Sequence, residues 1–184
     1  LDRRASGADL VAVGGNLDRI PSELVMRADV AGLADIAGGP IGVGSATSAE
    51  TAVLERLLAE RGLERPRDYT LVELHFILRW AMLLGGKTRA MLIDMPLHAL
   101  PKSAQERPET KVALDLLELA PAMQFTCLAA SRARAAAERE TYVGFLRAFA
   151  AAHAWLHANR EESAALLAEK AHVDERDALA QAVA

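Results

Sequence analysis

The chain has 184 residues, 52% of them hydrophobic and 25% charged, which is a globular balance and argues against a disordered protein. Its formal charge is −4 and its basic residues are scattered, so the sequence shows no basic patch that would bind nucleic-acid phosphates. The single cysteine, Cys127, excludes an internal disulfide, and its apolar neighbours predict a small buried side chain. No segment approaches the roughly 20 apolar residues of a membrane span.

Up to residue 94, short apolar runs alternate with helical patterns. Strands are expected at 9–13, 24–26, 41–43, 69–74 and 90–93. A helical turn is expected at 33–37, and helices are expected from the turn at 44–48 to Gly62 and over 77–84. Alternation of this kind predicts an α/β protein with a parallel sheet covered by helices.

Beyond residue 108 the pattern becomes mainly helical. Strands are expected at 111–117 and 125–129, and helical sequence prevails from Arg132 onward. Apolar and aromatic residues then recur at the spacing of one helical face: Tyr142, Phe145, Leu146, Phe149, Ala152, His153 and Leu156. Asn159 is expected to end this helix. Two shorter helices are expected to follow, at 161–170 and 174–183.

The turn at 44–48 is the strongest indication of function. It joins a short apolar strand to an amphipathic helix, and backbone N–H groups at a helix start carry partial positive charge. The hydroxyls of Ser45, Thr47 and Ser48 add hydrogen-bond donors, so we expect this turn to face a ligand, and the donors favour an anion. Alternatively, Thr47 and Glu50 form a capping box, in which the Thr47 hydroxyl binds the third amide of the helix. In that case Ser45 and the remaining amides stay available.

Three further polar residues follow predicted strands, near the carboxyl ends where ligands bind in open α/β sheets. His75 is suited to donate to an anionic or heteroaromatic ligand, and a half-buried histidine bound to backbone is the alternative. Arg79 is suited to bind a sulfonate or carboxylate through two N–H groups, or to pair with Glu73 or Asp94. Asp94 suits a cationic or amino-bearing ligand, or closes an Asx turn.

Asn16 follows two glycines and is either a residue of the ligand site or a plain turn residue. The histidines lack the spacing of metal ligands, and neither a catalytic triad order nor a phosphate loop appears. We therefore expect no metal, no cofactor and no catalytic residues. The sequence favours binding over catalysis.

Several motifs together resemble the periplasmic substrate-binding proteins of importers for nitrate, alkyl sulfonates, taurine and thiamine-precursor pyrimidines. The segment 34–45 is similar to the family's DLKGKxIGV strand and its Ser/Thr turn, and 57–63 is similar to its LLAxxGL helix end. Further matches are Arg79, Ala81, the segment 86–90, Pro96, the segment 145–149, Trp155, Leu156 and Asn159. The chain departs from the family at Arg89, where aspartate is usual, and at 74–76, where a small glycine-rich loop is usual.

The resemblance implies a type II periplasmic-binding-protein-like α/β fold with two lobes, the second complete and the first partial. It assigns 1–30 to a remnant of the first lobe and the crossover strands. It assigns 31–130 to the second lobe, and 131–184 to a helical return to the first. The opening strands and helices of the first lobe are missing, so we expect a piece of a longer protein.

The resemblance also implies the solute-binding component of an ABC-type importer. Such a protein captures a sulfonate, nitrate, taurine or a pyrimidine-like solute between its lobes and presents it to a membrane permease. The expected location is periplasmic, or extracellular with a lipid anchor. Two alternatives on the same fold are an enzyme like thiamine-pyrimidine synthases and the ligand-sensing effector domain of a transcription regulator. A homodimer that covers the cleft and the sheet edge is a further alternative.

Overall fold

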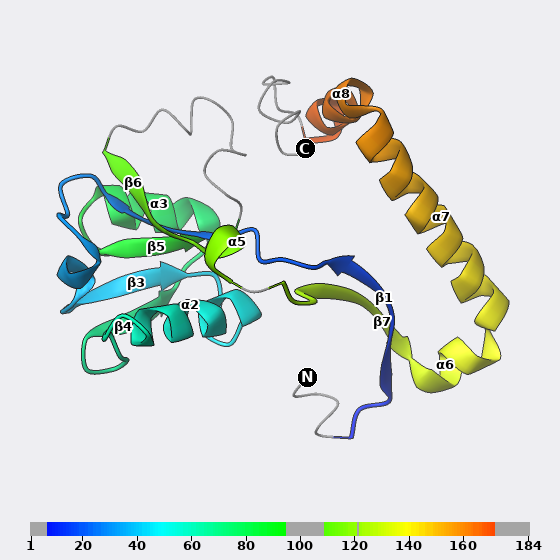
Figure 1. Ribbon diagram of the computed structural model, residues 1–184, viewed down its shortest axis with the longest axis horizontal. Coiled ribbons are helices and arrows are strands. Elements are labelled where there is room, and N and C mark those ends of the chain that lie inside the picture. The colour runs from blue at the N-terminus through cyan, green and yellow to red at the C-terminus, as the bar shows by residue number, and fades with distance from the viewer. Residues whose placement is uncertain (1–6, 95–108, 121, 172–184) are drawn as a thin grey trace. The chain divides into compact units, whose positions relative to one another are not determined.

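The computed structural model describes residues 7–94, 109–120 and 122–171 (Figure 1). The chain divides into two compact units. The α/β unit is Ile20–Pro121, and the ribbon unit combines Leu1–Arg19 with Ala122–Ala184. Pro96 and the helix expected at 174–183 lie outside the described residues.

The α/β unit is built on a five-stranded mixed sheet. Its strands are β2 (Glu23–Arg27), β3 (Gly39–Val43), β4 (Tyr69–Glu73), β5 (Ala90–Ile93) and β6 (Thr110–Asp115). They lie in the order β4-β3-β5-β2-β6. β3 pairs parallel with β4 and β5, whereas β2 pairs antiparallel with both β5 and β6. The expectation of a purely parallel sheet is therefore wrong for β2, because an apolar run carries no information about strand direction.

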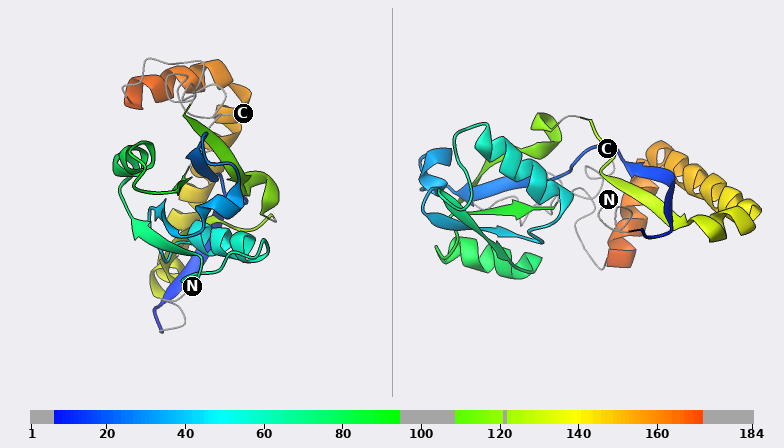
Figure 2. Two further views of the ribbon diagram at one scale, coloured as in Figure 1. Left: turned by 90° about the vertical axis from the view of Figure 1, so that its left-hand side faces the viewer. Right: turned by 90° about the horizontal axis from the view of Figure 1, so that it is seen from below.

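Helices cover both faces of this sheet (Figure 2). The 3-10 helix η1 (Leu33–Ile36) precedes β3, α2 (Ala49–Ala59) follows β3, α3 (Phe76–Leu84) follows β4 and the short α5 (Leu116–Leu119) follows β6. Figure 2 shows α2 and α3 on opposite sides of the strands. Burial on both faces explains why the strands read as continuous apolar runs in place of alternating ones.

The core of the α/β unit lies between the sheet and the helices. Under α3, one cluster of buried residues comprises Val25, Trp80, Leu83, Met91 and Ile93. The strand residues between these point to the other face, because successive side chains alternate. Leu24 and Leu92 are fully buried there, and α2 contributes Leu54, Leu57 and Leu58 to the core of the unit. The helix ends near Gly62, whose φ of 83° is in the region that glycine tolerates best.

In its described residues, the ribbon unit has two strands and three helices. β1 (Leu10–Leu17) pairs antiparallel with β7 (Thr126–Ser131), and α6 (Arg132–Ala137), α7 (Arg139–Ala158) and α8 (Arg160–Ala171) follow. β1 is longer than expected, because it continues through both glycines. None of its residues is buried, so the expectation of a strand in a sheet covered by helices is wrong here. Cys127 on β7 is also exposed, which corrects the prediction of a buried thiol.

Helix α7 confirms the predicted helix and its end at Asn159. Phe145 and Phe149 stack on one side of the helix, with ring centroids 5.9 Å apart. The His153 ring is tilted against Phe149, with centroids 4.6 Å apart. None of its residues is buried, and Phe145 and Trp155 are about half exposed. In the described parts of the chain, no helix has the length and apolar character that crossing a membrane requires.

Candidate functional site

The candidate site lies where β3, β4, β5 and β6 end and β2 begins, which we call the carboxyl edge of the sheet. In the register, Val43 pairs with Glu73 and Gly42 pairs with Met91, so β3, β4 and β5 end at the same side. Six of the sequence-predicted residues are in the α/β unit at this edge: Ser45, Thr47, Ser48, His75, Arg79 and Asp94. Residues from three separate segments are therefore brought together as expected from strand ends.

Asn16 lies in the ribbon unit. It is on β1, so its interpretation as a plain turn residue is wrong. Its side-chain amide donates to the Thr126 hydroxyl across the ribbon, at 3.3 Å. A role of Asn16 in ligand binding stays a prediction.

The turn between β3 and α2 is closed by Ser48, and not by Thr47. Ser48 is the N-cap of α2, and its Oγ accepts from the Thr51 amide at 3.4 Å and donates to the Ser45 carbonyl at 3.0 Å. The Thr51 hydroxyl donates to the same carbonyl at 2.8 Å. The capping box predicted at Thr47 is therefore wrong by one residue, because these bonds fix the first helical turn from Ser48. Thr47 is exposed.

Glu73 is a site residue that the sequence interpretation did not include among the ligand contacts. It is the last residue of β4, and its Oε1 accepts from the Ala46 amide at 2.6 Å and from the Ser45 hydroxyl at 3.4 Å. The chain itself thus places a carboxylate at the turn for which we expected an anion. The available signal was the position of an acid at the end of a strand next to the turn.

Two amides at the start of α2 are left over. Those of Ala49 and Glu50 have no hydrogen-bond partner among the described residues. Helix starts characteristically leave such donors unpaired, and together with the helix dipole they produce a weakly positive region. The Glu73 carboxylate therefore lies against the turn at Ser45 and Ala46, and the two free N–H groups follow that turn directly along the chain.

Arg79 is buried, with 3% of its side chain exposed, and pairs with Asp94 at the end of β5. Nη2 lies 2.7 Å from Oδ2 and Nη1 lies 3.3 Å from Oδ1, and Nη1 also donates to the Leu92 carbonyl. Of the two pairings left open by the sequence, the structure shows the one with Asp94. A Cβ on Gly44 would lie 3.6 Å from Arg79 Nη2, so the guanidinium sits directly beside the turn.

His75 precedes α3 and is exposed. Its carbonyl accepts from the Arg79 amide at 3.0 Å, and its side chain makes no capping bond. The alternative of a half-buried histidine bound to backbone is therefore not what the structure shows. The imidazole does not cap the helix and is not buried, so it is accessible to a ligand.

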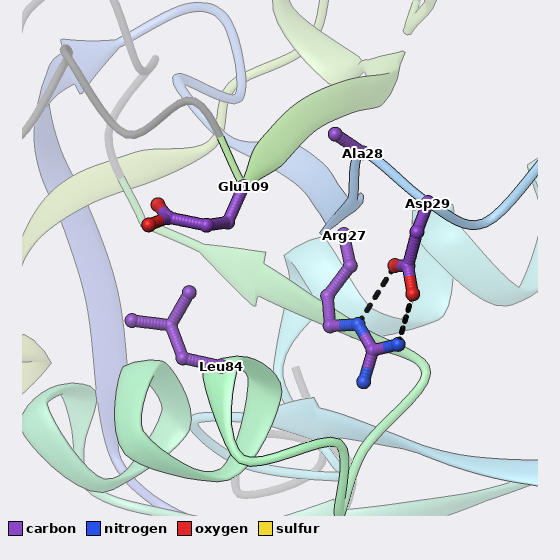
Figure 3. A pocket seen from close by; sticks show the side chains of 5 residues that line it. All are labelled: Arg27, Ala28, Asp29, Leu84 and Glu109. Atoms are coloured by element: carbon purple, nitrogen blue, oxygen red, sulfur yellow. Dashed lines mark hydrogen bonds and ion pairs between the residues drawn. The ribbon is translucent and has the colours of Figure 1, made fainter.

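A cavity of about 430 Å³ lies at the opposite edge of the sheet, where β2 ends and β6 begins (Figure 3). It is lined by Arg27, Ala28, Asp29, Leu84 and Glu109. Arg27 Nε lies 2.8 Å from Asp29 Oδ1, and this side-chain bond holds the pKa of Asp29 below its usual value. Figure 3 shows Glu109 pointing away from that pair. Arg27 and Asp29 thus satisfy each other, as Arg79 and Asp94 do at the carboxyl edge.

Comparison with known proteins identifies the family. A model described as "NMT1/THI5 like" matches residues 1–163. The chain belongs to the NMT1/THI5-like family. This confirms the resemblance seen in the motifs. No curated protein sequence matches the chain significantly.

Solved structures of similar fold include two sulfonate-binding proteins. The periplasmic aliphatic sulphonate binding protein SsuA from Escherichia coli superposes with a TM-score of 0.78 at 24% identity, over 97% of this chain and 60% of that one. The alkanesulfonate-binding protein SsuA from Xanthomonas axonopodis pv. citri, bound to MOPS, gives 0.77 at 22% identity, over 98% and 61%. This NMT1/THI5-like chain therefore has the predicted type II periplasmic-binding-protein-like α/β fold. It spans about 60% of the length of these structures.

Proposed function

We propose that this chain is part of the solute-binding component of an ABC-type importer. The observation that carries the proposal is family membership combined with a polar carboxyl edge. That edge gathers hydroxyls, free amides and an exposed imidazole from two segments of the α/β unit. Solved structures with this fold include proteins named for binding aliphatic and alkane sulfonates. The proposed work is reversible capture of a small organic solute, and not catalysis.

The residues proposed to contact the solute fall into two groups. Ser45, Thr47, Ser48 and His75 offer donors at the turn and at the start of α3. Arg79 and Asp94 act as a pair, in which the buried guanidinium orients the half-exposed carboxylate toward the edge. Asn16 is proposed to contribute from the ribbon unit. Sulfonates, nitrate, taurine and pyrimidine-like solutes are the candidate ligands.

The proposed mechanism follows from the fold family. A solute held between two lobes stabilises the closed form by its differential affinity for that form. A membrane permease then recognises the closed form. The proposed location is therefore periplasmic, or extracellular with a lipid anchor on the protein. Self-association into a homodimer is an additional proposal, checked by sedimentation of the purified chain.

The experiment compares the double variant Ser45→Ala/Thr47→Ala with the wild-type chain. Calorimetric titration with alkanesulfonates, taurine, nitrate and an aminomethylpyrimidine identifies a binder. We expect the double variant to bind that solute about tenfold more weakly, since two hydrogen-bonding groups are lost. Far-UV circular dichroism should stay unchanged, because neither hydroxyl caps α2.

The matched control is Thr70→Ala, which removes an exposed hydroxyl from the start of β4, far along the strand from the carboxyl edge. Its affinity for the solute should equal that of the wild-type chain. Equal affinity of the double variant and the wild type would contradict the site assignment. Absence of binding by every solute class would contradict the proposed function.

A further inference from the structure

Charge is unevenly divided between the two edges of the α/β unit. Of the lysines and arginines in the described part of this unit, only Arg79 lies at the carboxyl edge. The others lie toward the opposite edge: Arg27, Arg56, Arg61, Arg65, Arg67, Lys87, Arg89 and Lys111. Carboxylates at the carboxyl edge are those of Glu23, Glu50, Glu73, Asp94, Asp115 and Glu118. The edge assigned to the solute is therefore acidic.

The pairing of Arg79 removes from the competition for a ligand the one lysine or arginine that the described residues place at this edge. Its guanidinium is buried and bonded to Asp94 through two nitrogen–oxygen contacts. A free anion would have to displace an intramolecular carboxylate that already has the correct geometry. Intramolecular groups have a high effective concentration, so this exchange is unfavourable.

Glu73 extends the same argument to the turn. Its Oε1 is bonded to the Ala46 amide, the donor that an anion would otherwise use. Its Oε2 has no hydrogen-bond partner among the described residues, and the side chain is exposed. One oxygen of this carboxylate is hydrogen-bonded and holds the group in place. The other oxygen can accept a hydrogen bond from a charged N–H donor.

We infer that the solute carries a protonated amine, or another cationic N–H group, that binds the Glu73 carboxylate. This inference rests on the proposed function for the existence of a solute, and it names the chemical class. The site selects zwitterionic and cationic solutes over plain anions. In a zwitterion the acidic group takes the free amides of Ala49 and Glu50, and the amine takes Glu73. Glu73 is thus the residue that sets the specificity.

The test uses the full chain, labelled with ¹⁵N, and two solutes that differ by one ammonium group. Ethanesulfonate is a plain anion, and taurine (2-aminoethanesulfonate) adds an ammonium group to it. Dissociation constants are taken from the chemical shifts of the Ala46, Ala49 and Glu50 amides. We expect taurine to bind about tenfold more tightly than ethanesulfonate, as a charge-assisted hydrogen bond provides.

The decisive variant is Glu73→Gln, which can still accept from the Ala46 amide but carries no charge. It should bind the two solutes equally, to within about twofold. Glu60→Gln is the matched control, because Glu60 is an acid at the far end of α2, and it should keep the preference for taurine. Retention of that preference in Glu73→Gln would overturn the inference.

The remaining outcomes separate this inference from the proposed function. Equal binding of both solutes by the wild-type chain, or a preference for ethanesulfonate, overturns the inference and leaves solute binding intact. If neither solute shifts an amide of the carboxyl edge, the inference is overturned, and the proposed function is contradicted as well if nitrate and an aminomethylpyrimidine also fail to bind.

Discussion

Arg79 and Asp94 connect α3 to the end of β5 through a paired contact of 2.7 Å between Nη2 and Oδ2 and 3.3 Å between Nη1 and Oδ1. The two partners differ in environment: the arginine side chain is 3% exposed and that of the aspartate 53%. The buried charge therefore depends on the aspartate, whereas the aspartate retains contact with water. Removal of Asp94 should therefore lower the free energy of unfolding more than removal of Arg79.

Asp94→Ala should lower the free energy of unfolding of the α/β unit by about 2 to 3 kcal/mol, because a buried guanidinium loses its counter-ion. Arg79→Met should cost less, about 1 kcal/mol, since water hydrates the remaining carboxylate and methionine fills the volume. Denaturant unfolding in a Trp155→Phe background measures this through Trp80, which is in the core of this unit. An Asp94→Ala variant as stable as the background would contradict the account.

Ser48→Ala should destabilise the α/β unit by about 1 kcal/mol, because the Thr51 amide and the Ser45 carbonyl lose their bonds to the cap. Thr47→Ala should stay within about 0.5 kcal/mol of wild type, since Thr47 is exposed and does not cap the helix. Thermal unfolding of both variants gives the comparison. A larger loss for Thr47→Ala than for Ser48→Ala would restore the capping box at Thr47.

Asp9 makes the ribbon unit sensitive to acid. Its Oδ2 accepts from the Ala133 amide at 3.1 Å and the Ser131 hydroxyl at 2.9 Å, and these bonds, the one from Ala133 foremost, lower the pKa of Asp9 below 3.8. A lowered pKa means that the ionised form stabilises the fold. This contribution is fully present above the pKa of the unfolded chain and is lost as the pH falls through the lower folded value.

The Ala133 amide reports this titration directly. Its chemical shift should change with a midpoint below pH 3.8, and its protection against exchange, relative to the intrinsic exchange rate at each pH, should fall over the same range. Asp9→Asn should remove this transition, because an amide does not ionise. A midpoint at or above 3.8 in the wild-type chain would show that the bonds to Ala133 and Ser131 do not favour the carboxylate.

Local patterns predicted most elements of the α/β unit. The strand predicted at 90–93 is β5, with the same bounds, and the apolar residues of the helix predicted before Gly62 form the buried face of α2. These elements were predictable because short apolar runs and helical periodicity both record burial. The direction of β2 was not predictable from its residues, since a strand buried on both faces looks the same in either direction.

The sequence did not predict contacts between residues that lie far apart along the chain. Glu73 reaches the Ala46 amide only because β3 and β4 pair in one register, with Val43 opposite Glu73. The sequence left Glu73 and Asp94 as possible partners of Arg79. The end of β5 lies under α3, and this places Asp94, at that end, next to the Arg79 guanidinium. Cys127 was mispredicted because its apolar neighbours lie on a two-stranded ribbon and not in a core.

The most direct test of the central claim is a map of amide chemical-shift changes in the ¹⁵N-labelled chain during titration with taurine. The account predicts the largest changes at residues 45–50 and at His75, along the carboxyl edge of the sheet. Arg27, Asp29, Leu84 and Glu109, around the cavity at the opposite edge, should stay unchanged. Changes concentrated at that cavity, with none at 45–50, would contradict the proposed site.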